Sequence, residues 1–203
     1  MRRAFLSVAV AAALVFPVLG QAPAAPAAGP NTWTVDTGHS SAGFSVKHLM
    51  VSTVRGTLGP IKGTVEYDGR SVETLKVDVS IDVAAINTGN ASRDRDLKGE
   101  SFFDVAKFPT ATFKSKRVEA AGAGQFRLIG DLTMHGITKE VTLNVEGPSP
   151  AVKTQNGGQK VGASATVTLN RRDFGLQYNE AVEAVPVVAD DVQVTIDIEA
   201  NRK

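Results

Sequence analysis

Hydrophobic and polar residues alternate with a period of two along most of the chain beyond residue 30. In the segment LKVDVSIDV, the side chains of Leu75, Val77, Val79 and Ile81 share one face, and polar side chains share the other. Because successive side chains of a strand point to opposite faces, this alternation is typical of a half-buried strand. The pattern predicts eight strands, near residues 40–50, 53–67 (bent at Gly59-Pro60 and Gly63), 74–84, 111–118, 125–134, 137–147, 159–170 and 190–200.

Two segments depart from the alternation toward helix. One is NASRDRDLKGESFF, where Asn90 or Ser92 is a suitable N-cap, and the other is a shorter candidate around YNEAVEA. The remaining connections are short and rich in turn residues, so neighbouring strands should be antiparallel. Eight antiparallel strands with one apolar face each predict an all-β protein, either a sandwich or a closed up-and-down barrel.

The size of the inward side chains helps to choose between these two architectures. In VGASATVTLN the alternation places Ala163 and Ala165 on the inner face, next to Val167. Two alanines there leave volume unfilled, although a facing phenylalanine could occupy it. Small inward residues therefore favour an eight-stranded barrel with room for a ligand.

The first 28 residues have a different character. Arg2 and Arg3 precede an apolar run from Ala4 to Leu19, and small residues follow as far as Ala28. This order is typical of a secretory signal, with a cut expected between residues 20 and 28 and a single domain over residues 29–203. The start RRAFL also resembles a twin-arginine signal, but Met1 and Ser7 stand where that signal usually carries a hydroxyl residue and a lysine, so general secretion is preferred. The run is shorter than the ~20 residues of a spanning helix, so no stable membrane insertion is expected.

Charge and cysteine content exclude several classes of function. Loss of Arg2 and Arg3 with the signal would change the formal net charge from +1 to −1, so no basic field indicates a nucleic-acid partner. The chain has no cysteine, which excludes disulfides, thiol chemistry and cysteine-ligated metals.

The residues give little support to catalysis or metal binding. There are three histidines, and His39 and His48 are nine residues apart, which puts them on opposite faces of a regular strand. His135 precedes Gly136 in a predicted turn. Zinc needs three or four converging ligands, and neither a G-x-S-x-G elbow nor a phosphate-binding P-loop is present, so we predict no metal, no catalytic residue and no cofactor.

Several segments, in this order and spacing, resemble the YceI-like family: DTGHSSAGFSVKHLMVSTVRG, INTGNASRDRDLKGESFFDVAKFPTATFKS, GDLTMHGITKEVTL, LNRRDFGL and ADDVQVTIDIEA. The likeness runs from about Trp33 to Ala200. It implies a lipocalin-like eight-stranded antiparallel β-barrel with one or two short helices, exported to the periplasm, whose apolar lumen binds polyisoprenoid or other long amphiphilic lipids. Many members carry Arg-Asp-x-His-Leu where this chain reads Arg93-Asp94-Arg95-Asp96-Leu97, so a role of that histidine does not transfer. Transient membrane contact and a homodimer stay open.

Alternation and the resemblance together give a set of candidate lumen residues. Phe102 and Phe103 would close one barrel end as a lid, or staple the helix onto the barrel. His48 is either a satisfied core histidine, which we prefer, or a head-group donor. The alternative for the whole set is an ordinary packed core. The candidates are Phe44, Val46, His48, Met50, Leu75, Val77, Val79, Ile81, Phe102, Phe103, Phe113, Phe126, Leu128, Ala163, Ala165 and Val167.

Cationic side chains near the predicted helix could meet an anionic head group. The candidates besides His48 are Arg93, Arg95 and Arg171, with Lys98 and Arg172 beside them. Aspartates alternate with these cations, so a solvated, self-paired surface is the preferred interpretation.

The leading hypothesis is a non-enzymatic periplasmic carrier or scavenger of long-chain isoprenoid-type lipids. Two alternatives predict different interiors. An exported enzyme or redox accessory acting on an isoprenoid quinone requires a polar cluster in the pocket, whereas a ligand-free, stress-related barrel requires a lumen filled by side chains.

Overall fold

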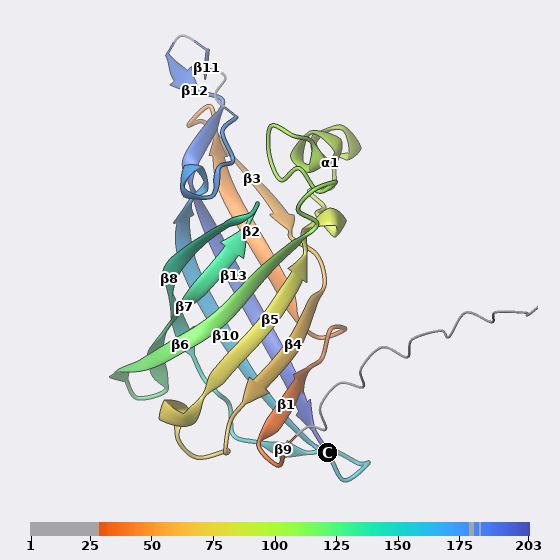
Figure 1. Cartoon of the computed structure of the whole chain (residues 1–203), viewed down its shortest axis with the longest axis vertical. Coiled ribbons are helices and arrows are strands. Elements are labelled where there is room, and N and C mark those ends of the chain that lie inside the picture. The colour runs from red at the N-terminus through yellow and green to blue at the C-terminus, as the bar shows by residue number, and fades with distance from the viewer. Residues whose placement is uncertain (1–28, 179–180, 183) are drawn as a thin grey trace, which may run out of the picture.

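The computed structural model describes residues 29–178, 181–182 and 184–203, and the predicted signal sequence lies outside these residues. The described chain forms a closed antiparallel β-barrel (Figure 1). The strands are β1 (Thr32–Val35), β2 (Ser41–His48), β3 (Ser52–Thr57), β4 (Ile61–Glu66), β5 (Lys76–Asp82), β6 (Thr110–Gly122), β7 (Gln125–Met134), β8 (Ile137–Glu146), β9 (Val152–Lys153), β10 (Gln159–Asn170) and β13 (Val188–Arg202), with a separate pair β11 (Ala181–Val182) and β12 (Val185–Pro186).

The ring has eight strand positions, and two of these positions are each occupied by a pair of short strands. β1 and β2 both pair with β13, through Val35 opposite Ala200 and Ala42 opposite Ile196, so together they occupy one strand position. β3 and β4 together occupy the next strand position, since β3 pairs with β2 and β4 pairs with β1. β5, β6, β7, β8 and β10 follow in order, and β10 returns to β13 to close the ring. The predicted eight-stranded antiparallel barrel is confirmed, and it excludes the sandwich.

The chain bends between β3 and β4 and within β4, at positions where glycines permit it. β3 ends at Thr57 and β4 begins at Ile61, with Gly59-Pro60 between them. Gly63 has φ of +141°, and a Cβ built there would lie 2.2 Å from the carbonyl oxygen of Asp78 on β5. A larger residue would therefore meet both backbone strain and a clash with the neighbouring strand.

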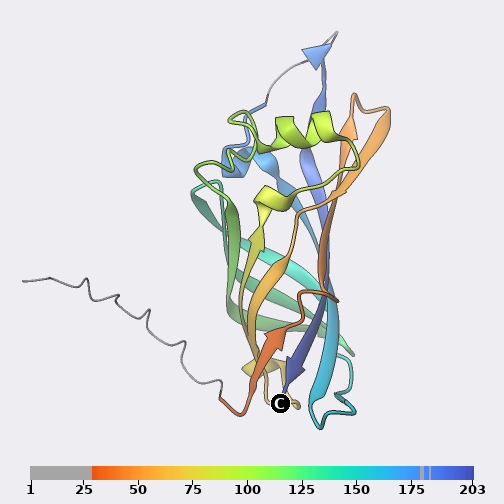
Figure 2. The same cartoon turned by 90° about the vertical axis from the view of Figure 1, so that its right-hand side faces the viewer.

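One α-helix, α1 (Ala91–Lys98), forms within the described residues, together with three 3-10 turns: η1 (Val72–Thr74), η2 (Val83–Ala85) and η3 (Arg171–Phe174). The side chain of Asn90 caps α1 by accepting hydrogen bonds from the backbone amides of Ser92 and Arg93, which satisfies two otherwise free donors. α1 lies across one end of the barrel, called the upper end here (Figure 2).

The second predicted helix, around YNEAVEA, is wrong where the structure describes that segment. Residues 181–182 form strand β11, paired with β12, while residues 179, 180 and 183 lie outside the described part. Two strands were also missed: β1, which is only four residues long, and β9, which is a two-residue addition to β10.

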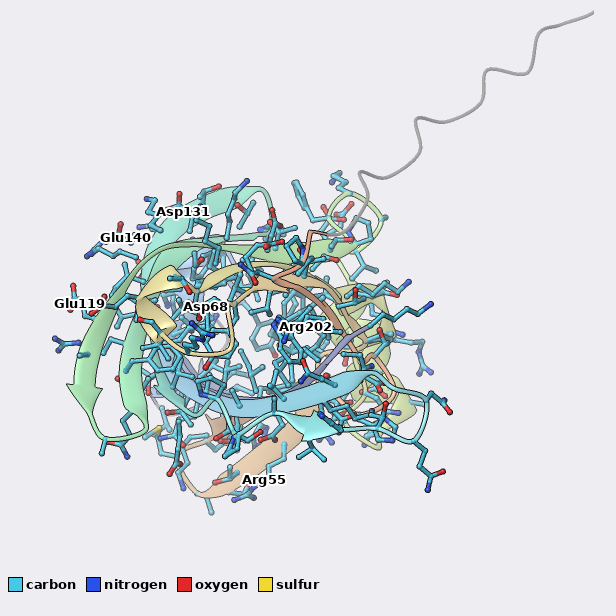
Figure 3. All side chains as sticks on the ribbon, turned by 90° about the horizontal axis from the view of Figure 1, so that it is seen from below. Arg55, Asp68, Glu119, Asp131, Glu140 and Arg202 are labelled. Carbon is cyan, nitrogen blue, oxygen red and sulfur yellow. The ribbon has the colours of Figure 1, made fainter. Side chains whose placement is uncertain are left out.

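Aromatic side chains pack at the lower end of the barrel. Trp33 is fully buried, and its indole Nε1 donates a 2.8 Å hydrogen bond to the carbonyl oxygen of Tyr67. The guanidinium of Arg202 covers the Trp33 ring at 4.3 Å from the ring centre. Figure 3, viewed from below, shows Arg202 over this end and Glu119, Asp131 and Glu140 at the periphery. An apolar cluster therefore packs at the lower end, and a cation lies over it.

No helix within the described residues combines the length and the apolar character needed to cross a membrane.

Candidate functional site

The barrel encloses a large apolar cavity. The space between its lining side chains has a volume of about 1260 Å³, including the part open to solvent. The wall that faces this space exposes apolar surface only, although Tyr67 and Ser164 are among the lining residues. Burial, together with the charge of Asp68, raises the pKa of the Tyr67 phenol, so its hydroxyl stays neutral.

The side chains of the inner face do not fill the interior of the barrel at the packing density normal for proteins. On β5, the inward residues Val77, Val79 and Ile81 all retain partial exposure, whereas a filled core would bury them. Protein interiors normally contain few voids larger than a water molecule. The incomplete burial and the cavity volume together show a hollow barrel, contrary to the filled lumen required by the ligand-free alternative.

A smaller cavity lies at the upper end, beneath α1. Its volume is about 630 Å³ including its open part, and its exposed wall is also apolar. Leu97 of α1 and Phe102 and Phe103 of the following loop contribute to its lining. The two cavities meet at four side chains that line both, here called the waist: Leu58, Met134, Leu169 and Val194.

Most of the predicted lumen residues line one of these two cavities. Those that line the larger cavity are Leu75, Val77, Val79, Ile81, Phe113, Phe126, Leu128, Ala163, Ala165 and Val167. Those that line the smaller cavity are Phe44, Val46, Phe102 and Phe103.

Met50 was predicted to face the lumen, and this is wrong. Met50 is 59% exposed, in a turn beyond the end of β2. Leu49 and Met50 have φ of 51° and 57°, and the amide of Val51 donates to the carbonyl oxygen of His48, so the chain reverses here in a tight hairpin. Alternation along the sequence continues through this turn, but the side-chain direction does not.

His48 lies on the same side of β2 as Phe44 and Val46 but beyond the residues that line the smaller cavity. It is half-buried, paired with Ser52 on β3 and with Val188 at the start of β13. The structure therefore places His48 at the upper rim of the barrel rather than within the lumen.

Phe102 and Phe103 close the upper end from inside. Both are buried, and Phe102 stacks on the ring of Tyr178 with 4.8 Å between ring centres. They pack into the cluster that also contains Phe174 and Leu176. Because they also border the smaller cavity, the predicted lid and the predicted staple describe the same arrangement.

The cations of α1 do not converge on either cavity. The Arg93 guanidinium donates to the Thr88 hydroxyl at 2.8 Å and to the Thr88 carbonyl oxygen at 3.1 Å. Arg95 is exposed and Lys98 is half-buried, and neither lines a cavity. Asp94 accepts hydrogen bonds from the Thr88 hydroxyl and amide, which lower its pKa. This face of α1 anchors the helix to its preceding turn.

Arg171 differs from the other predicted cations because its side chain is only 4% exposed and borders the smaller cavity. It donates to the carbonyl oxygens of Leu176 (2.6 Å), Ala189 (3.0 Å) and Val188 (3.2 Å), and pairs with Asp190 at 2.8 Å. Burial lowers the pKa of Arg171, yet arginine stays charged at any ordinary pH. Its bonds tie η3 to the start of β13, so its first role is structural.

A separate polar cluster lies on the lower half of the barrel, away from both cavities. Asp36, His39 and Glu199 have ligand atoms within 4.8 Å of one another, the geometry of a loose metal site. However, the ammonium of Lys160 already contacts both carboxylates. Hydrogen bonds from Asn201, His39 and Lys160 hold the pKa of Asp36 well below its usual value, and those to Glu199 and Asp36 raise the pKa of Lys160. The cluster is therefore a self-compensated staple between β1, β10 and β13.

Several residues that line the cavities were not among the lumen residues predicted from the sequence. They come from β8 (Val141, Leu143, Val145), from β13 (Val194, Ile196, Ile198, Ala200) and from short or irregular segments (Leu58, Ile61, Val65, Tyr67, Met134, Leu176). The first two groups follow the same alternation and could have been found from it. The third group lies at bends and strand ends, where alternation gives no direction.

The sequence and the fold have clear relatives. A YceI-like domain model matches residues 33–200. A UPF0312 protein of Staphylococcus aureus (strain N315) is 38% identical over 151 residues, which cover 74% of this chain and 85% of that protein.

Solved structures have the same fold. The Campylobacter jejuni YceI protein is 32% identical with a TM-score of 0.66, over 77% of this chain and 90% of that one. Burkholderia cenocepacia BcnA has a TM-score of 0.68 at 23% identity, over 81% and 98%. A polyisoprenoid binding domain from Saccharophagus degradans has a TM-score of 0.63 at 16% identity, over 84% and 98%. The hollow apolar barrel, the family model and these relatives together place the chain in the YceI-like family.

Proposed function

We propose that this protein holds one long-chain amphiphilic lipid of isoprenoid type in its barrel, as a carrier or scavenger in the periplasm. The observation that carries the proposal is the continuous apolar wall around a cavity of about 1260 Å³. Ligand pockets are concave and mostly apolar, and this one has the character of a site for a chain rather than for a polar metabolite.

The cavity volume limits the ligand. A methylene group occupies about the volume of a water molecule, ~30 Å³. The space of about 1260 Å³ includes the part open to solvent, so about 40 such groups is an upper limit and the enclosed part holds fewer. Transfer of each methylene from water contributes about 0.8 kcal/mol. Association itself costs an estimated 4–15 kcal/mol, so a chain of about ten carbons only breaks even, and a useful ligand is clearly longer.

The polar head group belongs at the upper end. The larger cavity exposes no polar surface, and Trp33 and Tyr67 pack together at the lower end. The smaller cavity exposes no polar surface either, but Arg171 is the charged residue among those that line it. A chain that passes the waist would therefore carry its head group toward η3 and α1.

A quinone-modifying enzyme or redox accessory finds no specific support. Such a protein needs a polar cluster at the reacting group, and within the described residues neither cavity exposes polar surface. Export to the periplasm rests on residues 1–28, whose pattern is that of a secretory signal. The isoprenoid class is supported by the described ligand class of the Saccharophagus degradans domain, which shares the fold.

Native mass spectrometry of the protein purified from its host without detergent tests the proposal. A long apolar adduct at near one-to-one ratio, identified after organic extraction, supports it. An adduct-free mass, together with no uptake of added prenyl or acyl lipids, would overturn it. Cell fractionation tests the location separately, since recovery in the cytoplasm with residues 1–28 intact contradicts export.

A further inference from the structure

The hairpin formed by β2 and β3 extends past the ring at the upper end of the barrel (Figures 1 and 2). Its tip exposes two apolar side chains: Met50 is 59% exposed and Val51 is 86% exposed. Among the described residues, the other strongly exposed large apolar side chain, Val152 at 63%, lies on β9 at the opposite end. Within the described residues, these two side chains are therefore not part of the packed core.

The backbone at this tip is of a kind that bulky residues rarely adopt. Leu49 and Met50 lie in the three-residue connection between the paired residues His48 and Ser52, and both have positive φ, a conformation usual for glycine, asparagine or aspartate. Strain of this kind collects at functional positions, because it has to be offset by the surrounding structure. Here it fixes the positions of two apolar side chains beyond the rim.

The tip is supported by the neighbouring segment. The amide of Leu49 donates a 3.0 Å hydrogen bond to the carbonyl oxygen of Val187. Val185 is 36% exposed, and Pro186 is also exposed, just before that carbonyl. The apolar surface therefore extends from the hairpin tip to the beginning of β13.

The charge of the hairpin gives this surface a partner. Residues 41–57 contain Lys47 and Arg55 and no acidic residue. Both cations are exposed, and neither forms an ion pair with another described residue. Figure 3 shows Arg55 pointing outward from the ring. Two acidic residues of β13 lie near this register: Asp190 is held by Arg171 and Arg172, and Asp191 is exposed and accepts a hydrogen bond from Asn170.

We propose that this hairpin docks the barrel onto an anionic phospholipid bilayer, with Met50 and Val51 entering the interface and Lys47 and Arg55 binding lipid phosphates. Apolar side chains at a membrane surface flanked by cations are the usual elements of interfacial binding. The inference extends the proposed function, because it brings the end of the barrel that carries the smaller cavity against the source of the lipid.

Vesicle flotation tests the docking surface directly. The protein should float with vesicles of phosphatidylethanolamine and phosphatidylglycerol, and M50S/V51S should lower the partition coefficient about tenfold or more, because two apolar side chains no longer leave water. V152S is the matched control: it removes a valine that is 63% exposed at the other end and should partition as the parent protein does. K47Q/R55Q should weaken binding to these vesicles and leave the weaker binding to phosphatidylcholine vesicles unchanged.

The outcomes separate docking from lipid storage. Unchanged flotation of M50S/V51S, with an unchanged thermal midpoint, overturns the docking surface. A change in oligomeric state of M50S/V51S by sedimentation, without a change in flotation, assigns the tip to a second copy of the chain instead. Uptake of prenyl lipid from detergent solution, measured on the same variants, reports on the proposed function alone and should not depend on Met50 and Val51.

Discussion

Substitution of Ala165 by phenylalanine places a ring in the larger cavity. Ala165 lies on β10 opposite Val145 and Ile196, and all three side chains border the cavity. The change adds roughly six carbon atoms, which enter a void instead of a packed core. We therefore expect A165F to fold, with a thermal midpoint equal to or above that of the parent protein, because overpacking costs arise only where space is already filled.

The effect on lipid binding should depend on chain length. A chain near the limit of about 40 carbons fills the cavity, so the ring expels about six methylenes and the loss is up to about 5 kcal/mol, roughly a 10³-fold rise in Kd. A chain of about 15 carbons occupies less than half of the 1260 Å³ and can shift aside, so its Kd should change little.

Titration of A165F with a series of prenyl or acyl lipids, by displacement of a fluorescent fatty acid, measures this dependence. The control is T166F, which adds the same ring one residue further on, at an exposed position on the outer face. Equal affinity of A165F and the parent protein for the longest chains would refute the reasoning, since the chain would then not occupy the lumen beside β10.

Three further predictions concern stability. Trp33→Ala removes a fully buried indole and its bond to Tyr67, and should cost about 3–5 kcal/mol in urea unfolding. Arg171→Met removes the donor to the carbonyl oxygens of Leu176, Ala189 and Val188 and should cost about 3–5 kcal/mol, whereas a loss below about 1 kcal/mol would contradict the structural role. The pKa of Asp36 is depressed below its usual 3.8, so its hydrogen bonds stabilise the fold above that pH and this contribution is lost on acidification. Asp36→Asn should therefore be less stable than the parent protein at neutral pH, with a difference that shrinks below about pH 4, as denaturant titrations at several pH values would show.

The strands were predictable because their inner and outer faces meet different surroundings. On β5, one face meets the lumen and the other meets water, so hydrophobic and polar residues alternate along the whole strand. The bend at Gly59-Pro60 was also readable, because proline and glycine interrupt a strand for local reasons. Closure of the ring was not readable from alternation, because pairing of Val35 with Ala200 joins segments far apart in the chain.

The residues of the candidate site were likewise predictable in regular strands and not predictable at turns and bends. Alternation correctly predicted that Ala163 and Ala165, in the middle of a regular strand, line the cavity. It placed Met50 in the lumen because it takes no account of a turn with positive φ. Side chains near helices and bends, such as Leu58 and Leu176, enter the cavities through the path of the backbone. For Arg171, the sequence indicated a cation, and only the fold shows that its hydrogen-bond partners are carbonyl oxygens of the same chain.

When β1 with β2, and β3 with β4, are each counted as one strand of the ring, the pairing of β8 with β10 is the shortest in the barrel. These strands pair over residues 144–146 and 164–166, whereas β10 and β13 pair along twelve residues. Above that short join η3 borders the gap, with the Phe174 carbonyl oxygen 3.2 Å from Nδ1 of His135. A closed barrel has no free edge from which to fray, so local opening has to begin at its weakest join. Amide hydrogen exchange should therefore be fastest, among the barrel strands, where β8 and β10 diverge, and transient opening there would let a chain enter sideways while the rest of the ring stays paired.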